Sequence, residues 1–563
     1  MNTSDHFTAA AIARLCAEGG VQHVVICPGS RNAPLVIAFN AEARITPYQV
    51  IDERSAGFFA LGLAQQLRSP VALICTSGSA VLNLAPAVAE AFYQRVPLLV
   101  ITADRPAEWT DQGEGQSIRQ EKVLAPHVRM SVQLPRDTPD DLARWYCVRS
   151  INGAIDATLL PVPGPVHVNV PFAEPLYGRY DHAPDVRRVV QMPTVTSLAP
   201  AQAKALSDAI SASGRVLVLA GQGKWGRAVM DHLWQLAELP QVAVLTEATS
   251  NLQGPKFITC IDRAIEAIGP HNVDALRPDL LITFGGAIVS KRIKALLRKW
   301  RPDQHWHVDA GQRHFDTYQS LTHDIAVTPE VFLPQIGRNA RPNTGAGYGD
   351  AWRTLDQRTR ERHIALLEQA PWCDLTVFDE VLAHIPFDTD VHLGNSTAVR
   401  YAQLFDRLPD HHFFSNRGTS GVEGCVSTAV GAAWATQRTT TLIVGETAFL
   451  YDSNAFWNAH LSPHLKVIVI DNGGGNIFRF IEGPDRDPEL LRWFEAPHGR
   501  DAAALVRSFA LPCQEATDMD TLRSGLEWLY GTHDRPAVLV VRTPALVSPK
   551  VLRDYFKALR DPA

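Results

Sequence analysis

The sequence predicts an α/β protein of three doubly wound domains, each built around a parallel sheet. Short β-branched runs alternate with helical patterns along almost all of the 563 residues, which is typical of parallel-sheet layers. Two irregular segments, 181–202 and 335–350, interrupt this alternation. A chain of this length is expected to hold three or four domains at about 150 residues each. We therefore expect domains at 1–182, 183–345 and 346–563.

Each domain is expected to contribute its own set of short strands, separated by helices such as the one predicted at 53–67. The sets follow one another along the chain and are joined by the two irregular segments. The expected strands are 23–27, 48–51, 71–75, 98–102 and 166–170; then 215–220, 242–246, 280–284 and 305–309; then 390–396, 411–416, 440–446, 466–472 and 536–543.

Composition and charge indicate a globular protein of the cytoplasm. Hydrophobic residues make up 46% of the chain, and its net charge of −6 predicts no general affinity for nucleic acid or membranes. None of the eight cysteines forms a C-x-x-C pair, which argues against structural zinc or disulfides and for a reducing compartment. Residues 1–20 resemble a capped helix more than a signal peptide, and no apolar run reaches the roughly 18–20 residues of a membrane span.

A glycine-rich turn in the second expected domain allows two interpretations. Gly221, Gly223 and Gly226 follow a strand and precede a helix, as in a dinucleotide-binding turn, with Glu247 as a candidate ribose ligand. However, Trp225 is bulky, and Glu247 lies 26 residues beyond Gly221. A nicotinamide or flavin site therefore stays open, but a purely structural turn is favoured.

Two strands of the third expected domain end in polar residues. Strand 440–445 leads into Glu446, and strand 466–470 leads into Asp471, Asn472 and three glycines. Parallel strands joined by a helix end at the same edge of a sheet, where α/β domains bind ligands. Carboxylate and amide oxygens beside a phosphate suit Mg²⁺. The alternative is an ordinary loop with a solvated acid.

This arrangement resembles the diphosphate and metal motif of thiamine-diphosphate enzymes. At the positions of the family's Gly-Asp and Asn-Asn pairs this chain has Gly445-Glu446 and Asp471-Asn472, so two residues differ from the usual pattern. The resemblance implies thiamine diphosphate and Mg²⁺ or Mn²⁺ as cofactors. Glu446, Asn472 and Gly474 would hold the metal ion.

Glu53 matches the second element of that family, a glutamate just after the second strand of the first domain. The resemblance implies that Glu53 hydrogen-bonds the aminopyrimidine ring of the cofactor and takes part in its proton transfers. Taken alone, Glu53 could equally be an acid that is favourable at a helix N-terminus.

Further motifs resemble one subfamily, the 2-succinyl-5-enolpyruvyl-6-hydroxy-3-cyclohexene-1-carboxylate synthase (MenD) family of menaquinone biosynthesis. The resemblance covers nearly the whole chain and is strongest in the outer thirds. It implies decarboxylation of 2-oxoglutarate and 1,4-addition of the succinyl unit to isochorismate. The motifs are CPGSRNAPL (27–35), TSGSAVLNLAPAVAEA (76–91), TADRP (102–106), GQSIRQ (115–120), SKR (290–292), GNSTAVR (394–400), SNRGTSGVEG (415–424) and GGNIF (474–478).

The resemblance also implies a substrate site rich in arginine and lysine, which suits two dicarboxylates. Arg400 and Arg417 would hold the succinyl carboxylate, and Phe478 would line the pocket and exclude water. Gly115 stands where many family members have asparagine. The residues on the isochorismate side would be Ser30, Arg31, Arg105, Gln116, Lys291 and Arg292. The residues on the cofactor would be Glu53, Ser396, Val422, Gly445, Asn472, Asn476 and Ile477.

In this superfamily the glutamate and the diphosphate site come from different subunits, so a homodimer is implied, and a homotetramer is compatible with it. Two rival functions stay open. One is another thiamine-diphosphate decarboxylase or carboligase for a smaller 2-oxo acid. The other is a non-catalytic homologue that serves as a binding subunit, which the replacement of aspartate by Glu446 suggests.

Overall fold

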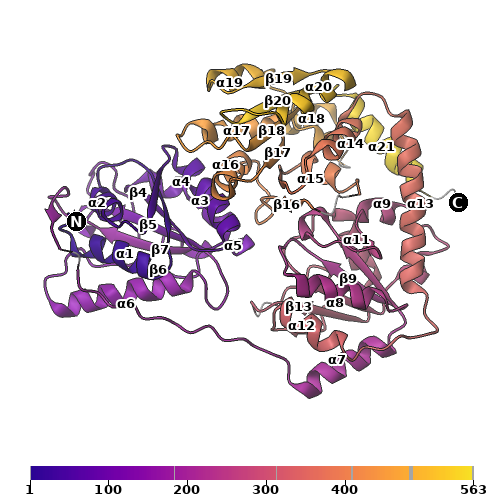
Figure 1. Cartoon of the computed structure of the whole chain (residues 1–563), viewed down its shortest axis with the longest axis horizontal. Coiled ribbons are helices and arrows are strands. Elements are labelled where there is room, and N and C mark those ends of the chain that lie inside the picture. The colour runs from indigo at the N-terminus through magenta and orange to yellow at the C-terminus, as the bar shows by residue number, and fades with distance from the viewer. Residues whose placement is uncertain are drawn as a thin grey trace.

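The computed structural model describes residues 2–182, 184–311, 314–406, 410–480, 483 and 486–560. It contains three six-stranded sheets, and every pairing within them is parallel, so the predicted fold class is confirmed. In Figure 1 the first sheet lies on the left, the second at the lower right and the third at the top. The boundaries at 182/183 and 345/346 stay predictions.

The first sheet has the order β3-β2-β4-β5-β7-β6. Alternate side chains of its strands point to opposite faces, so Val24 packs with α1, α2 and α6, while Val25 packs with α3 and α5. The strands are β2 (His23–Ile26), β3 (Thr46–Gln49), β4 (Val71–Cys75), β5 (Leu98–Asp104), β6 (Ser131–Gln133) and β7 (Val166–Pro171). The helices are α1 (Phe7–Glu18), α2 (Ala33–Ala41), α3 (Glu53–Leu67), α4 (Ser79–Asn83), α5 (Ala85–Gln94) and α6 (Asp141–Ala157).

The second sheet has the order β11-β10-β9-β12-β13-β14. Helices α7, α8 and α12 cover one face, and α9, α11 and α13 cover the other. The strands are β9 (Val216–Ala220), β10 (Val242–Thr246), β11 (Phe257–Ile258), β12 (Leu280–Phe284), β13 (Gln304–Val308) and β14 (His323–Ile325). The helices are α7 (Pro200–Ala212), α8 (Arg227–Ala237), α9 (Ile261–Glu266), α10 (Val273–Leu276), α11 (Lys291–Trp300), α12 (Pro329–Gly337) and α13 (Tyr348–Gln369).

The third sheet has the order β16-β15-β17-β18-β20-β19. The strands are β15 (Asp390–Leu393), β16 (His412–Phe414), β17 (Thr440–Gly445), β18 (Leu465–Asp471), β19 (Cys513–Ala516) and β20 (Ala537–Arg542). The helices are α14 (Asp374–His384), α15 (Thr397–Ala402), α16 (Cys425–Thr436), α17 (Glu446–Tyr451), α18 (Pro488–Glu495), α19 (Ala502–Ser508), α20 (Met519–Leu529) and α21 (Val547–Leu559).

Smaller elements complete the fold. β1 (Thr3–Ser4) pairs antiparallel with β8 (Arg179–Tyr180). The short 3-10 helices are η1 (Ala107–Trp109), η2 (Ala125–His127), η3 (Ala248–Ser250), η4 (Ser453–Phe456) and η5 (Asn476–Arg479). Across the described ranges, no helix combines the length and apolar character that a membrane span requires.

The first and third sheets share one hydrophobic core. Helices α3 and α16 pack against each other, and buried residues of both sheets join them in a single cluster. In Figure 1, α3 and α16 lie side by side where the indigo and orange parts meet. This shared core holds the loops of the third sheet at a fixed place relative to the first domain.

Candidate active site

The strand ends that were predicted to form a cation site lie side by side. Gly445 of β17 pairs with Ile470 of β18, so Glu446 and Asp471 follow at the same edge. Glu446 is only 1% exposed, and burial raises the pKa of its carboxyl to about 8, assisted by the charge on Asp471. Its Oε1 atom is buried without a hydrogen-bond partner. His498 Nε2 lies 3.7 Å from this atom. A buried carboxylate oxygen that accepts no hydrogen bond fits a divalent cation.

Asn472 is oriented by a residue that the sequence analysis missed. Its Nδ2 donates to Oδ2 of Asp374 over 2.9 Å, and Asp374 is fully buried at the start of α14. Thr543 Oγ1 donates to the other oxygen of Asp374 over 2.5 Å. The amide nitrogen of Asn472 is therefore engaged, and its Oδ1 is the atom left for a cation.

The glycine loop after β18 passes close beneath α18. Gly474 has φ +145°, and a Cβ there would lie 2.6 Å from the carbonyl oxygen of Glu495, so this position requires glycine. Gly475 N donates to the same carbonyl over 2.7 Å. The rings of Phe478 and Phe494 lie 5.3 Å apart, which further ties η5 to α18. Contacts with α18 therefore hold the glycine loop in place.

The predicted diphosphate residues lie on this loop and on the β15–α15 turn. Asn476 is buried; its Nδ2 donates to the carbonyl of Ala545 over 3.0 Å, and its Oδ1 has no partner. Ile477 is also buried. Ser396 has φ +70° just before α15, a strained conformation for a residue other than glycine. Strained backbone and an unpaired buried oxygen are typical of a binding site.

Arg400, on α15, and Arg417, on the loop after β16, come together. Arg417 Nη1 donates to Asn395 Oδ1 over 2.8 Å, and Arg400 Nη1 donates to the carbonyl of Ser396. Burial lowers the pKa of both guanidinium groups, and the charge of Arg417 lowers that of Arg400 further. Arg417 Nε is buried without a partner. Two half-buried cations with an unused donor form a suitable site for a carboxylate. Val422, on the loop that carries Arg417, is partly exposed.

The second domain adds the start of α11 to this region. Glu247, fully buried at the end of β10, accepts from the backbone amides of Val289 (2.6 Å) and Ser290 (2.7 Å). Burial lowers the pKa of Lys294, and the charges of Arg417 and Lys291 add to this, while Glu247 opposes it. Glu247 and Lys294 are thus close to Arg417 and Lys291. The sequence analysis named Glu247 only as a candidate ribose ligand and did not name Lys294.

Arg292 makes its contacts with α9 and α21. It forms an ion pair with Glu266, and its guanidinium carbon lies 4.0 Å from the centre of the Phe556 ring. Exposed Lys291 precedes it in the helix. The role of Arg292 in substrate binding stays a prediction.

The remaining predicted residues cluster in the first domain. Arg31 Nη1 donates to the carbonyl of Phe172 over 3.0 Å, and burial and the nearby Arg105 both lower its pKa. Arg105 Nε donates to the carbonyl of Gly115 over 2.8 Å. Ser30 and Gln116 are exposed beside them. Each arginine also pairs with an acid, Arg31 with Glu174 over 3.3 Å and Arg105 with Glu114 over 3.1 Å. The role of these four side chains in substrate binding stays a prediction.

Glu53 begins α3, as predicted. Its Oε2 accepts from Asn83 Nδ2 over 3.2 Å, and the preceding Asp52 caps the helix by accepting from Ser55 N over 3.1 Å. Among the described residues, no hydrogen bond or ion pair joins Glu53 to Glu446 or Asn472. The residues on either side of Glu53 do contact the segment that follows Glu446: Asp52 Oδ2 accepts from Asn454 Nδ2 over 2.7 Å, and Arg54 Nη2 donates to the carbonyl of Tyr451 over 2.8 Å.

The glycine-rich turn of the second domain packs against other segments of the same chain. A Cβ on Gly221 would overlap the carbonyl of Gly286. The turn residue Gln222 donates from Nε2 to the carbonyl of Ser415 over 2.8 Å. These contacts agree with the structural interpretation of the turn.

Three protein-family models match the chain. "Thiamine pyrophosphate enzyme, N-terminal TPP binding domain" matches residues 7–123, and "Middle domain of thiamine pyrophosphate" matches 201–386. "Thiamine pyrophosphate enzyme, C-terminal TPP binding domain" matches 393–541. The crystal structure of benzoylformate decarboxylase from Polynucleobacter necessarius has a TM-score of 0.72 at 16% identity and covers 97% of this chain and 100% of that one, which shows the same fold.

Curated relatives match nearly the full length. The 2-succinyl-5-enolpyruvyl-6-hydroxy-3-cyclohexene-1-carboxylate synthase of Flavobacterium johnsoniae is 40% identical over 564 residues, with 98% of each chain covered. The synthase of Porphyromonas gingivalis is 38% identical over 549 residues, which cover 95% of this chain and 94% of that one. The resemblance predicted from the motifs is confirmed. The chain belongs to the 2-succinyl-5-enolpyruvyl-6-hydroxy-3-cyclohexene-1-carboxylate synthase family of thiamine pyrophosphate enzymes.

Proposed function

We propose that this protein decarboxylates 2-oxoglutarate and adds the remaining succinyl unit to isochorismate by 1,4-addition, as a step of menaquinone biosynthesis. The observation that carries this proposal is the pair of half-buried guanidinium groups of Arg400, on α15, and Arg417, on the loop after β16, with Arg400 hydrogen-bonded to the predicted diphosphate residue Ser396. A buried cation pair is costly unless an anion accompanies it, and a dicarboxylate supplies that anion.

The acid and amide at the ends of β17 and β18 would hold the cofactor through a divalent cation, Mg²⁺ or Mn²⁺. Glu446 would supply Oε1, which accepts no hydrogen bond and lies 3.7 Å from His498 Nε2, and the hydrogen bond to Asp374 leaves Oδ1 of Asn472 available. The backbone at Gly474 is the third expected ligand. Ser396, Asn476 and Ile477 would bind the diphosphate, Gly445 would line its site, and Val422 would contact the cofactor rings. Bound thiamine diphosphate supplies the carbanion-stabilising chemistry.

Different cationic residues would bind each of the two substrates. Arg400 and Arg417 would bind the distal carboxylate of 2-oxoglutarate, which remains as the succinyl carboxylate. The first-domain set, Ser30, Arg31, Arg105 and Gln116, would bind isochorismate together with Lys291 and Arg292. Phe478, packed on Phe494, would keep water from the reacting carbon.

Glu53 would hydrogen-bond the aminopyrimidine ring and move its proton. The family resemblance implies that Glu53 and the diphosphate site come from different subunits, so a second copy of the chain is proposed to complete the site. The proposed assembly is a homodimer, and a homotetramer is compatible with it. We place this enzyme in the cytoplasm.

Calorimetry followed by a synthase assay tests the proposal. The expected result is binding of thiamine diphosphate that requires Mg²⁺, followed by loss of isochorismate only when 2-oxoglutarate is present. Isochorismate loss with pyruvate but not with 2-oxoglutarate would identify another carboligase. Absence of cofactor binding would leave only a non-catalytic subunit.

A further inference from the structure

The loop at residues 415–424, which carries Arg417, is held by a buried acid of the first domain. Glu90 lies on α5, and its side chain is fully buried. Its Oε1 accepts from Gly418 N over 2.7 Å, and its Oε2 accepts from Thr419 N and Thr419 Oγ1, each over 2.6 Å. Three donors from the two residues after Arg417 therefore meet one carboxylate.

The loop approaches α5 so closely that Gly418 leaves no room for a side chain. A Cβ at this position would lie 2.8 Å from the carbonyl oxygen of Glu90 and 3.0 Å from Cβ of Tyr93. Backbone atoms cannot move aside as a flexible side chain would. The close approach and the three hydrogen bonds are two separate observations of the same contact.

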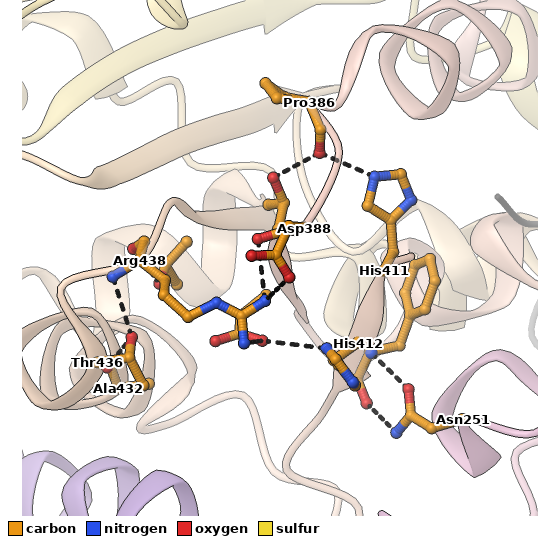
Figure 2. A network of polar contacts seen from close by, with 12 residues as sticks. Asn251, Pro386, Asp388, His411, His412, Ala432, Thr436 and Arg438 are labelled. Atoms are coloured by element: carbon orange, nitrogen blue, oxygen red, sulfur yellow. Dashed lines mark hydrogen bonds and ion pairs between the residues drawn. The ribbon is translucent and has the colours of Figure 1, made fainter. Parts of the chain in front are cut away.

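Other contacts leave little freedom on the remaining sides of the loop. Asn395 Nδ2 donates to the carbonyls of Asn416 and Gly421, both over 2.8 Å. From the second domain, Gln222 donates to the carbonyl of Ser415, and Asn251 pairs with both backbone groups of Phe413 in β16 (2.7 and 2.9 Å). Figure 2 shows Asn251 facing this strand next to His412. All three domains thus contribute to the position of the loop.

Glu90 also balances charge. Burial lowers the pKa of Arg417, and the negative charges of Glu247 and Glu90 oppose this shift. A half-buried guanidinium group stays charged, and nearby acids offset the cost of removing that charge from water before the substrate arrives.

We propose that Glu90 is a positioning residue: it fixes the 415–424 loop so that Arg417 meets the distal carboxylate of the 2-oxo acid, without touching the substrate itself. This inference rests on the role proposed above for Arg417. Loss of the carboxylate removes the three charge-assisted hydrogen bonds to Gly418 and Thr419, so the loop shifts and the substrate contact weakens.

Four variants test the proposal through KM, kcat and amide hydrogen exchange. Glu90→Ala is expected to raise KM for 2-oxoglutarate about tenfold or more and to leave KM for isochorismate nearly unchanged. Gly418→Ala disturbs the same contact from the loop side and is expected to act in the same direction. Thr419→Val removes one of the three donors, and Glu90→Gln keeps one acceptor oxygen, so both are expected to have smaller effects.

The matched control is Asp156→Ala, which removes a largely buried acid of the same domain that pairs with Arg188. In the cofactor-free protein, Glu90→Ala is expected to speed hydrogen exchange at Gly418 and Thr419, while Asp156→Ala does not. Unchanged exchange and an unchanged KM for 2-oxoglutarate in Glu90→Ala would overturn the inference. An equal rise in both KM values would also overturn it, because the contact would then be generally structural.

Arg417→Ala separates this inference from the proposed function. If Arg417→Ala raises KM for 2-oxoglutarate but Glu90→Ala does not, the inference fails and the function stands. If Arg417→Ala leaves this KM unchanged, the role proposed for Arg417 fails, and the inference fails with it.

Discussion

Asn472 donates its side-chain amide to the fully buried carboxylate of Asp374, 98 residues earlier in the chain. This 2.9 Å hydrogen bond engages the amide nitrogen and leaves Oδ1 of Asn472 as the atom available to a cation. A residue that orients a metal ligand typically changes metal affinity by about 10–100-fold when it is lost.

Asp374→Ala is therefore expected to weaken the Mg²⁺-dependent binding of thiamine diphosphate by about 10–100-fold, because Asn472 loses its partner. Calorimetry over a Mg²⁺ titration measures this. Asp379→Ala, which removes an exposed acid of the same helix, is the control. Equal affinities for Asp374→Ala and the control would contradict this role for Asp374.

If different cationic residues bind the two substrates, replacing them should raise KM for one substrate and not for the other. Arg417→Ala or Arg400→Ala is expected to raise KM for 2-oxoglutarate by about 10–100-fold, since each loses a charge-assisted hydrogen bond. Arg31→Ala or Lys291→Ala is expected to raise KM for isochorismate instead. Steady-state kinetics with each substrate varied in turn checks this, and equal effects on both constants would refute the division.

Arg292 and Lys291 lie in the same SKR motif, and the structure predicts different effects when each is replaced. Its ion pair with buried Glu266 and its stacking on Phe556 predict that Arg292→Ala lowers the thermal unfolding temperature more than Lys291→Ala does. If Arg292 also binds substrate, as the sequence motif predicts, KM for isochorismate rises as well. A stable Arg292→Ala protein would contradict the structural part of this prediction.

Glu53→Gln is expected to reduce kcat by about 10²–10⁴-fold, because an amide cannot exchange the proton that the carboxylate moves. Hydrogen–deuterium exchange at the thiazolium carbon of the bound cofactor should slow in parallel, while cofactor affinity changes little. Glu42→Gln removes an acid of the same domain that pairs with Arg44 and serves as the control. Full activity of Glu53→Gln at saturating cofactor would disprove the assignment.

The buried carboxyl group of Asp452 is expected to make the free energy of unfolding depend on pH. It is fully buried, and it accepts from Ser427 N (2.7 Å) and Ser427 Oγ (2.8 Å). Burial raises its pKa from 3.8 to about 6. Between these values the folded state keeps a proton that the unfolded state releases, so the free energy of unfolding falls as pH rises through this window.

Between pH 4.5 and 7 this residue should therefore cost the wild type about 2 kcal/mol of stability that Asp452→Asn does not lose. The measurement is the difference between the two proteins in urea unfolding at each pH, which cancels the other titrating groups. A difference that stays constant with pH, or that grows in the opposite direction, would contradict the prediction.

The central strands were predictable, but four edge strands were not. The interior strands, such as β17 and β18, are continuous apolar runs because helices cover both faces of the sheet. The missed strands β6, β11, β14 and β19 all lie at sheet edges, are two to four residues long, and mostly include polar residues. Their pairing depends on a neighbouring strand, which a local pattern does not reveal.

The candidate site shows the same contrast. Glu446 and Asn472 were predictable because parallel strands end at one edge of a sheet. Glu90 lies 329 residues from Thr419, so no local spacing pointed to that contact. Lys291 and Arg292 share one motif, yet successive residues of a helix point about 100° apart, and the structure sends Arg292 to Glu266.

The most direct test of the account follows the carbons of the first substrate. The protein is incubated with thiamine diphosphate, Mg²⁺, isochorismate and uniformly ¹³C-labelled 2-oxoglutarate, and the products are analysed by mass. The account predicts labelled carbon dioxide and an adduct of isochorismate that carries the other four labelled carbons. An isochorismate that stays unlabelled, with all label in carbon dioxide and succinic semialdehyde, would contradict it.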